Sequence, residues 1–316
     1  MVQPNPNQDK LPIVYFGSGP LAAESLAFLH ENFEVEAVIT KPRAAHHKGP
    51  VPVIEFCESH NLPYHTPANK AELSEFFSLS QFESSMGVVI DYGIIINRDV
   101  IDTFSQGIVN SHFSLLPEWR GADPITFAIL SGQTKTGVSL MLIDEKMDEG
   151  PLLAQAEVTL LPTTTAFSLT KELIEVSNVL LSEVLPLYHD GGIQPVPQSS
   201  TISETKTPSY SRRLSKADGA LDWQKPAEHL EREIRAYLAW PRSYTTLGQV
   251  GVTVTAAHVI PQTTKPAGTI ELHKESGTLL VHCAAGCLSI DAIQPAGKKE
   301  MSVAEFIRGY GSRVTG

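Results

Sequence analysis

Short apolar runs alternate with amphipathic stretches through the first half of the chain, and this rhythm constrains the fold more than any other feature. Apolar residues follow helical spacing at 20–30 and again at 52–60. The apolar runs that read as buried strands stand at 11–16, 35–40, 87–90 and 107–111. Buried strands separated by amphipathic helices pair side by side in parallel, with helices on both faces of the sheet. We therefore predict an α/β fold built on a mostly parallel sheet.

A different composition begins after a long amphipathic stretch at 165–189, which is expected to be a helix. Residues 191–209 hold three prolines, no aromatic residue and many hydroxyls, a composition typical of a linker. Beyond it a helix is expected at 226–238, and short strands are expected at 253–260, 268–272, 278–283 and 288–293. Regularly spaced short strands predict a small β-barrel or sandwich. We therefore predict an N-terminal domain (1–190), a linker (191–209) and a C-terminal domain (210–316).

Charge is unevenly distributed along the sequence. The net charge is −11, which by itself argues against a nucleic-acid partner. Residues 1–205 hold 10 Lys and Arg against 25 Asp and Glu, whereas residues 206–316 hold 14 against 10. The two balances, −15 and +4, sum to the −11 of the whole chain. Such asymmetry indicates separate tasks for the two parts.

The sequence lacks the marks of a membrane or secreted protein. No apolar run approaches the ~20 residues of a bilayer-spanning helix, and the polar N-terminus does not resemble a signal peptide. Three cysteines, Cys57, Cys283 and Cys287, are too few and too scattered for a disulfide framework or a zinc ribbon. We expect a cytoplasmic protein with no membrane partner.

Two local motifs have simple explanations. Residues 17–22 (GSGPLA) resemble the GxGxxG/A fingerprint that cradles a dinucleotide pyrophosphate. That fingerprint also needs an acidic residue about 20 positions later, where the sequence reads TKPR at 40–43. A tight strand-to-helix turn is therefore favoured over nicotinamide binding. Residues 46–48 (HHK) favour an exposed basic loop over a metal site, because no carboxylate or cysteine stands at ligand spacing.

Polar residues cluster on the last of the apolar runs and just after it. Because side chains alternate along a strand, Asn110, His112 and Ser114 are expected to share one face. An amide can stabilise a developing oxyanion, and an imidazole can take a proton from an attacking atom. Downstream, the carboxylate of Asp148 could orient or polarise the histidine. The residues alone leave two interpretations open: a site for addition to a carbonyl group, or a satisfied polar strand end.

The most specific motif stands at residues 110–153. It contains, in order, Asn-x-His, Ser-Leu-Leu-Pro, Arg-Gly, Pro-Ile, Thr-Gly-Val and a late Asp-x-Gly. This ordered string resembles the central segment of folate-dependent formyltransferases. Residues 210–223 (YSRRLSKADGALDW) and 240–241 (WP) resemble the start of the second domain of the same family. Residues 294–302 (QPAGKKEMS) resemble the ending of the members that act on methionyl-tRNA.

This resemblance implies a fold, a site and a co-substrate. The fold implied is a Rossmann-like formyltransferase domain followed by a smaller OB-like β-barrel domain. Asn110 would bind the oxygen of the tetrahedral intermediate, His112 would accept or relay the amine proton, and Asp148 would tune His112 and pass a proton to the leaving folate nitrogen. The family's folate-associated turn is matched by Ser114, Leu115, Leu116 and Pro117. The co-substrate implied is 10-formyltetrahydrofolate, and no metal is required.

The resemblance also implies the acceptor, which is the α-amino group of methionine on initiator tRNA. We expect the protein to be a monomer. The tRNA polyanion would be held with salt-sensitive affinity by basic residues of the C-terminal part, for any one of which a solvated surface position is the alternative. These residues are Lys206, Arg212, Arg213, Lys216, Lys298 and Lys299. Two other functions are weighed: a sugar-nucleotide N-formyltransferase, which needs no RNA-binding surface, and a tRNA-binding module without chemistry. The +4 balance of residues 206–316 argues against the first, and the intact Asn110, His112 and Asp148 argue against the second.

The sequence departs from the family pattern at three places. The glycine turn at 17–22 lacks the usual Gly-Thr-Pro, and the loop at 41–49 is short and carries histidines where basic residues are usual. Both changes bear on how tRNA docks. The third departure is Asp91, which replaces the usual alanine before Tyr-Gly. It lies within Val88–Ile95, a stretch that the resemblance assigns to the pterin pocket.

Overall fold

The computed structural model describes residues 10–43, 49–202 and 207–314. The basic motif at 46–48 and Lys206 therefore lie outside the described residues. The chain divides into two compact units. The first unit comprises Met1–Gly121, Thr136–Val158 and Lys171–Tyr210, and the second comprises Ala122–Lys135, Thr159–Thr170 and Ser211–Gly316.

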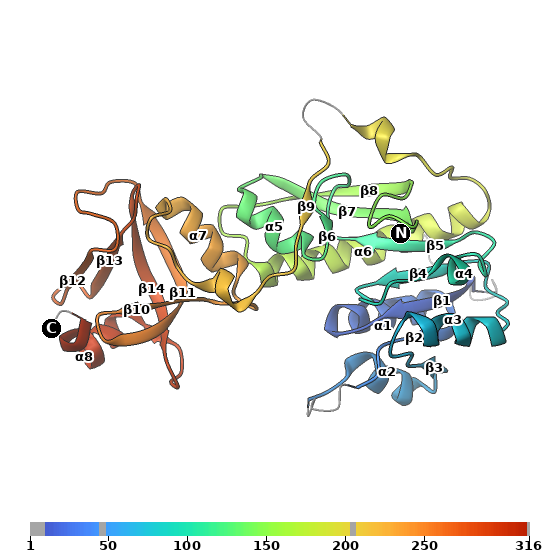
Figure 1. Ribbon diagram of the computed structural model, residues 1–316, viewed down its shortest axis with the longest axis horizontal. Coiled ribbons are helices and arrows are strands. Elements are labelled where there is room, and N and C mark those ends of the chain that lie inside the picture. Colours follow the sequence, from blue (N-terminus) through green and yellow to red (C-terminus); the bar gives the residue numbers. More distant parts are fainter. Residues whose placement is uncertain (1–9, 44–48, 203–206, 315–316) are drawn as a thin grey trace. The chain divides into compact units, whose positions relative to one another are not determined.

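The first unit is built on a seven-stranded sheet of order β3-β2-β1-β4-β5-β7-β8 (Figure 1). Neighbours from β3 to β5 are parallel, whereas β5 and β7 are antiparallel. The strands are β1 (Pro12–Gly17), β2 (Glu34–Ile39), β3 (Tyr64–His65), β4 (Gly87–Ile90), β5 (Ile108–His112), β7 (Lys135–Leu142) and β8 (Leu152–Thr159). The predicted mostly parallel sheet is thus confirmed.

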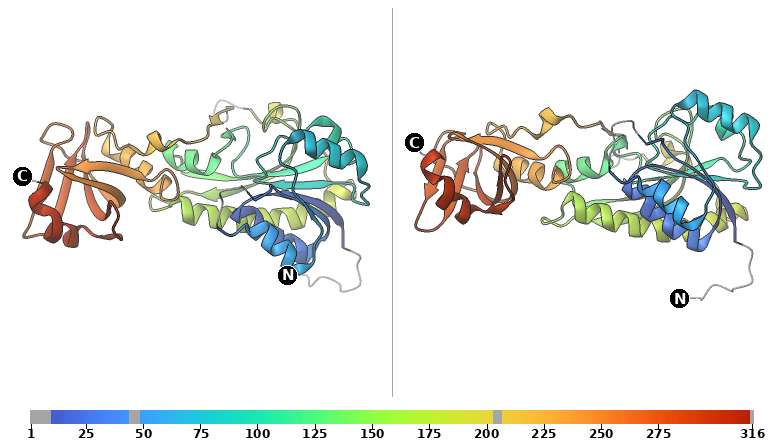
Figure 2. Two further views of the ribbon diagram at one scale, coloured as in Figure 1. Left: turned by 60° about the horizontal axis from the view of Figure 1, so that its bottom comes forward. Right: turned by 90° about the horizontal axis from the view of Figure 1, so that it is seen from below.

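Helices cover both faces of this sheet, as predicted (Figure 2). On one face the hydroxyl of Tyr15 on β1 donates to the carbonyl oxygen of Ala22 in α1. On the other face Phe16 stacks on Phe77 of α3, with ring centroids 5.6 Å apart. Consecutive residues of a strand point to opposite faces, so Tyr15 and Phe16 of β1 contact helices on opposite sides of the sheet. The helices are α1 (Pro20–Asn32), α2 (Pro52–His60), α3 (Lys70–Leu79), α4 (Arg98–Ile101) and α6 (Ala166–His189), of which α6 continues into the second unit.

The second unit carries an antiparallel sheet of order β10-β11-β14-β13-β12, with β15 paired to β14. Ala227, Leu230 and Ile234 of α7 follow helical spacing and are buried in its core. The small β domain expected from the sequence is confirmed. Its strands are β10 (Ser243–Leu247), β11 (Val250–Ile260), β12 (Ile270–His273), β13 (Thr278–His282), β14 (Cys287–Pro295) and β15 (Met301–Ser302). Its other elements are α5 (Pro124–Ser131), η2 (Lys216–Gly219), α7 (Ala227–Ala236) and α8 (Val303–Val314).

The stretch predicted as a linker, 191–209, has local structure. Val196 and Leu152 exchange two backbone hydrogen bonds of 2.8 Å each, which hold the stretch against the start of β8. A short 3-10 helix, η1 (Gln198–Thr201), follows. Further on, β9 (Tyr210–Ser211) pairs with β6 (Arg120–Gly121), which lies just after the polar motif of β5.

The remaining sequence expectations concern cysteines and membranes. All three cysteines are free and buried. Cys283 and Cys287 lie on either side of the turn between β13 and β14, and Cys283 belongs to the hydrophobic core of the second unit. Among the described residues, no helix combines the length and the apolar character needed to cross a membrane.

Candidate functional site

The candidate residues gather at the carboxyl edge of the parallel strands. Val89 of β4 lies in register with Asn110 of β5, and Phe16 of β1 lies in register with Val89. The residues that follow these three strands therefore emerge at one edge of the sheet. Ligands of open α/β sheets bind at this edge, beyond the strand ends. The sheet topology thus places the glycine turn, Asp91 and the end of β5 together.

Asn110 and His112 lie on the same face of β5, as predicted. The strand is hydrogen-bonded on both sides, to β4 and to β7, so its position is fixed. Asn110 is half-buried, and its side-chain amide makes no hydrogen bond to any described residue. An amide that is half-buried at a strand end without a protein partner has its two N–H donors available for a ligand.

Ser114 does not share this face, so that part of the prediction is wrong. β5 ends at His112, and the N–H of Ser114 turns back to the carbonyl oxygen of His112 at 3.0 Å. The Ser114 side chain is fully buried, and its hydroxyl donates to the carbonyl oxygen of Glu118 at 2.6 Å. A strand alternation rule applies only while the strand continues, and here the backbone leaves it two residues early.

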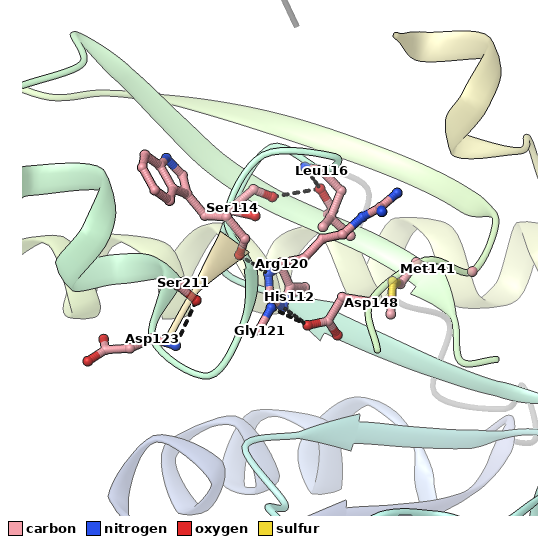
Figure 3. Close-up of polar contacts among 12 residues, drawn as sticks. His112, Ser114, Leu116, Arg120, Gly121, Asp123, Met141, Asp148 and Ser211 are labelled. Atoms are coloured by element: carbon pink, nitrogen blue, oxygen red, sulfur yellow. Dashed lines mark hydrogen bonds and ion pairs between the residues drawn. The ribbon is translucent and has the colours of Figure 1, made fainter. Parts of the chain in front are cut away.

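The imidazole of His112 is held between a carbonyl group and a carboxylate (Figure 3). Its Nε2 lies 2.9 Å from the carbonyl oxygen of Trp119, and its Nδ1 lies 3.8 Å from Oδ2 of Asp148. A carbonyl oxygen only accepts, so Nε2 carries the hydrogen of that bond. Nδ1, on the Asp148 side, is therefore the ring nitrogen that can exchange a proton.

Asp148 is fixed by its backbone conformation and by one strong contact. Its Oδ2 accepts a hydrogen bond of 2.7 Å from the N–H of Gly121, drawn in Figure 3, and its φ is +54°. Aspartate is among the few residues that tolerate this left-handed region. Gly150 closes the same turn, because a Cβ there would lie 1.8 Å from the carbonyl oxygen of Leu142. The structure therefore brings together His112 and Asp148, between which β6, α5 and β7 intervene in the sequence.

The turn at 114–117 is held by hydrogen bonds to side chains of β7 and β8. Leu116 is fully buried, and its N–H donates to Oγ of Ser139 on β7 at 2.9 Å. The amide of Gln155 on β8 donates to the carbonyl oxygen of Leu116 at 2.9 Å. Leu115 alone of the four is partly exposed. The folate-associated role of Ser114–Pro117 stays a prediction, and the buried Ser114 and Leu116 act as supports in this geometry.

The glycine sequence at 17–22 forms the predicted tight turn from β1 into α1. Gly19 has a φ of +94°, and Pro20 begins the helix. The N–H of Ser18 donates to the carbonyl oxygen of Asp91 at 3.0 Å, so the turn is tied to the end of β4. Asp91 has a φ of +48° and is exposed, yet the protein atoms around it displace enough water to raise its pKa from 3.8 to about 6. Lys41 lowers this pKa in part.

The raised pKa of Asp91 gives a pH-dependent stability. The folded chain holds this proton more tightly than the unfolded chain, so stability falls as pH rises from about 4 to about 6. We expect Asp91→Asn to gain in melting temperature relative to the parent protein over that window and to keep a constant advantage above it. Thermal unfolding from pH 4 to 8 measures this, with Asp190→Asn, at an exposed position just after the end of α6, as the control. Parallel curves for the parent and Asp91→Asn would contradict it.

The basic residues of the second unit differ in their availability. The guanidinium of Arg212 pairs with both carboxylate oxygens of Asp218 and holds the pKa of that carboxyl well below its usual range. Arg213, Lys216, Lys298 and Lys299 are exposed. The sequence could not reveal the pairing of Arg212, since Asp218 lies six residues away in η2 and no single helix or strand contains both residues. Within the described residues, no group of three His, Cys, Asp or Glu side chains is placed to hold a metal.

The chain is similar to known proteins along nearly its whole length. Residues 13–185 match the family model described as formyl transferase, and residues 213–311 match the model of the formyl transferase C-terminal domain. A methionyl-tRNA formyltransferase of Chloroflexus aurantiacus is 37% identical over 303 residues, which cover 94% of this chain and 96% of the relative. One from Geobacillus thermodenitrificans is 34% identical over 310 residues, covering 96% and 95%.

Solved structures share the fold. An N-formyltransferase from Helicobacter canadensis, in complex with folinic acid and dTDP-3-aminofucose, has a TM-score of 0.66 at 16% identity and covers 93% of this chain and 100% of its own. HypX from Aquifex aeolicus, in complex with tetrahydrofolic acid, has a TM-score of 0.61 at 14% identity and covers 98% of this chain and 48% of its own. At such identities the likeness concerns the fold alone.

Proposed function

Because this chain belongs to the formyl transferase family, we propose that it transfers the formyl group of 10-formyltetrahydrofolate to the α-amino group of methionyl-initiator tRNA. The observation that carries the proposal is the likeness to methionyl-tRNA formyltransferases at 34–37% identity along 94–97% of the chain, which includes both domains. The product, N-formylmethionyl-tRNA, serves translation initiation.

The geometry at the end of β5 supports the catalytic roles assigned from the sequence. Asn110, whose side-chain amide has no hydrogen-bond partner among the described residues, donates to the formyl oxygen as the amine attacks and negative charge develops there. His112 accepts the amine proton at Nδ1, because its Nε2 is engaged with Trp119. Asp148, 3.8 Å from Nδ1, stabilises the imidazolium that results. The amine proton then passes by way of Asp148 to the folate nitrogen, as the bond between that nitrogen and the formyl carbon breaks.

The division of labour follows the charge. We assign the chemistry to residues 1–190 and tRNA binding to residues 210–316, joined through 191–209, in a monomeric cytoplasmic protein. The part from 206 onward carries the +4 balance, and the part before it carries −15. Chemistry on a neutral amine and a formamide needs a carbonyl clamp and proton management, and no metal has a part in the proposed reaction.

The decisive test is an acceptor assay with purified protein. We expect transfer of labelled formyl from 10-formyltetrahydrofolate to methionyl-initiator tRNA. An amino-sugar nucleotide is the matched alternative acceptor, because the fold is shared with an enzyme solved with such a ligand. Turnover of the amino sugar without transfer to the tRNA would overturn the proposal.

Exposed lysines of the C-terminal domain give a second expected result. We expect the double change Lys298→Gln and Lys299→Gln to weaken tRNA binding and to lower the slope of log Kd against log salt by about 1–2, since each phosphate contact contributes about one unit. Fluorescence anisotropy with labelled tRNA, at salt concentrations from about 50 to about 300 mM, measures the Kd and the slope. Lys171→Gln on α6, where the lysine pairs with Glu175 on an exposed face, is the control. An unchanged slope would show that these lysines do not meet phosphate.

A further inference from the structure

A buried glutamine in the predicted linker contacts the turn that carries Asp148. Gln198 begins η1 and is 3% exposed. Its Nε2 donates to the carbonyl oxygen of Asp148 at 2.8 Å and to that of Gly150 at 2.9 Å. A single amide group thus holds both ends of the three-residue turn from which the Asp148 side chain projects.

The orientation of this amide is fixed by its other end. Oε1 of Gln198 accepts from two nitrogens of Arg120, from Nη2 at 2.8 Å and from Nε at 3.2 Å. The reverse orientation would set the amide oxygen against two carbonyl oxygens and its N–H groups against a guanidinium, so it is excluded. Hydrogen bonds from a charged donor are about twice as strong as neutral ones, which makes this a firm contact in a buried place.

Arg120 is itself held from several sides and does not move independently. It is 6% exposed, and its Nη1 donates to the Tyr210 hydroxyl at 3.1 Å and lies 3.3 Å from Oε1 of Glu149. The next residue, Gly121, supplies the N–H that binds Oδ2 of Asp148. The Arg120–Gly121 strand therefore acts on Asp148 twice, directly at the carboxylate and through Gln198 at the backbone.

We infer that Gln198 is a positioning residue, which sets the Asp148 carboxylate against Nδ1 of His112 by bracing the 148–150 turn from the Arg120 guanidinium. Asp148 has a left-handed φ of +54°, which aspartate tolerates at some cost in free energy, so the two hydrogen bonds from Gln198 help to stabilise the turn. Among the described residues Gln198 forms no hydrogen bond with His112 or Asn110, and its two donors go to the turn that carries Asp148, so we assign its effect to Asp148. The inference rests on the proposed formyl transfer for its kinetic consequence.

The test uses an isosteric change with a matched control. Gln198→Glu keeps the size and the contact with Arg120 but replaces both N–H donors by an oxygen that faces two carbonyl groups. We expect kcat for formyl transfer to fall about 10- to 100-fold, because sub-ångström misplacement of a catalytic group has effects of this order. KM for the folate and for the tRNA should stay within about twofold, as ground-state binding is untouched. Gln194→Glu is the control, since Gln194 is exposed and, among the described residues, its side chain forms a hydrogen bond only with Gly191.

A spectroscopic readout separates this inference from the proposed function. We expect the ¹⁵N signals of the His112 ring, identified by their loss in His112→Ala, to shift in Gln198→Glu and to stay unchanged in Gln194→Glu. An unshifted His112 signal, or an unchanged kcat in a protein whose parent form transfers formyl, would overturn the positioning role. A shifted signal in a protein whose parent form transfers no formyl would support the positioning role and refute the proposed function. Gln198→Met, which removes both contacts without adding charge, gives the same readouts if the Glu variant does not fold.

Discussion

Replacing Asn110 by alanine is expected to lower kcat for formyl transfer by about 10²- to 10³-fold, the usual cost of losing one oxyanion-binding donor. The reason is geometric. The amide stands at the end of β5, half-buried, with no hydrogen-bond partner among the described residues, so its donors are preorganised for charge that develops during the reaction. The measurement is single-turnover transfer from 10-formyltetrahydrofolate to methionyl-initiator tRNA, which reports the chemical step without product release.

Asn110→Asp sharpens this prediction. The aspartate has the same shape but no N–H donors, and its negative charge would oppose that of the oxyanion. We expect it to be at least as slow as Asn110→Ala. Both variants should keep a melting temperature close to that of the parent protein, because no described group loses a hydrogen bond. Transfer at the parent rate in Asn110→Asp would show that the amide does not act as a donor.

Much of the fold could be predicted because the pattern of apolar residues along the sequence shows which faces of a strand or helix are buried. β4 has the predicted bounds, and β1, β2 and β5 are each shifted by one residue along the chain relative to the prediction. The pattern of apolar residues could not show at which residue a strand stops pairing with the strands beside it. At Ser114 the run of alternating polar residues continues, yet the backbone turns after His112 because the Ser114 N–H finds the His112 carbonyl oxygen.

The candidate site could be predicted in its side chains but not in its backbone partners. Asn110, His112 and Asp148 stand out by residue type, and the structure brings His112 and Asp148 within 3.8 Å. The Gly121 N–H and the Trp119 carbonyl oxygen orient them, and backbone groups leave no mark in a sequence. Gln198 was hidden for another reason: its neighbours are proline, serine and threonine, a composition that predicts a solvated linker and conceals one buried amide.

Changing Asp148 to asparagine is expected to lower kcat by about 10²- to 10⁴-fold, the range for a residue that assists general acid–base catalysis. The substitution removes charge and little else. Asparagine tolerates the left-handed φ of +54° as aspartate does. Its amide oxygen can still accept the hydrogen bond that the Gly121 N–H donates to Oδ2 of Asp148 at 2.7 Å in the parent protein. The imidazolium of His112 then lacks its counter-charge. Single-turnover rates with saturating tRNA measure the loss.

Glu145→Gln is the matched control for Asp148→Asn, since it removes one negative charge from an exposed position of the same loop. A general effect of charge on tRNA binding would change KM in both variants alike. An effect through His112 appears only in Asp148→Asn and only in kcat.

The comparison with Gln198→Glu then becomes informative, because that variant keeps the Asp148 charge and disturbs its position. If the charge and the position of Asp148 both act through the His112 imidazole, the double variant Asp148→Asn with Gln198→Glu should be no slower than Asp148→Asn alone. Additive losses would instead mean that Gln198 acts on the reaction by a route that does not include Asp148.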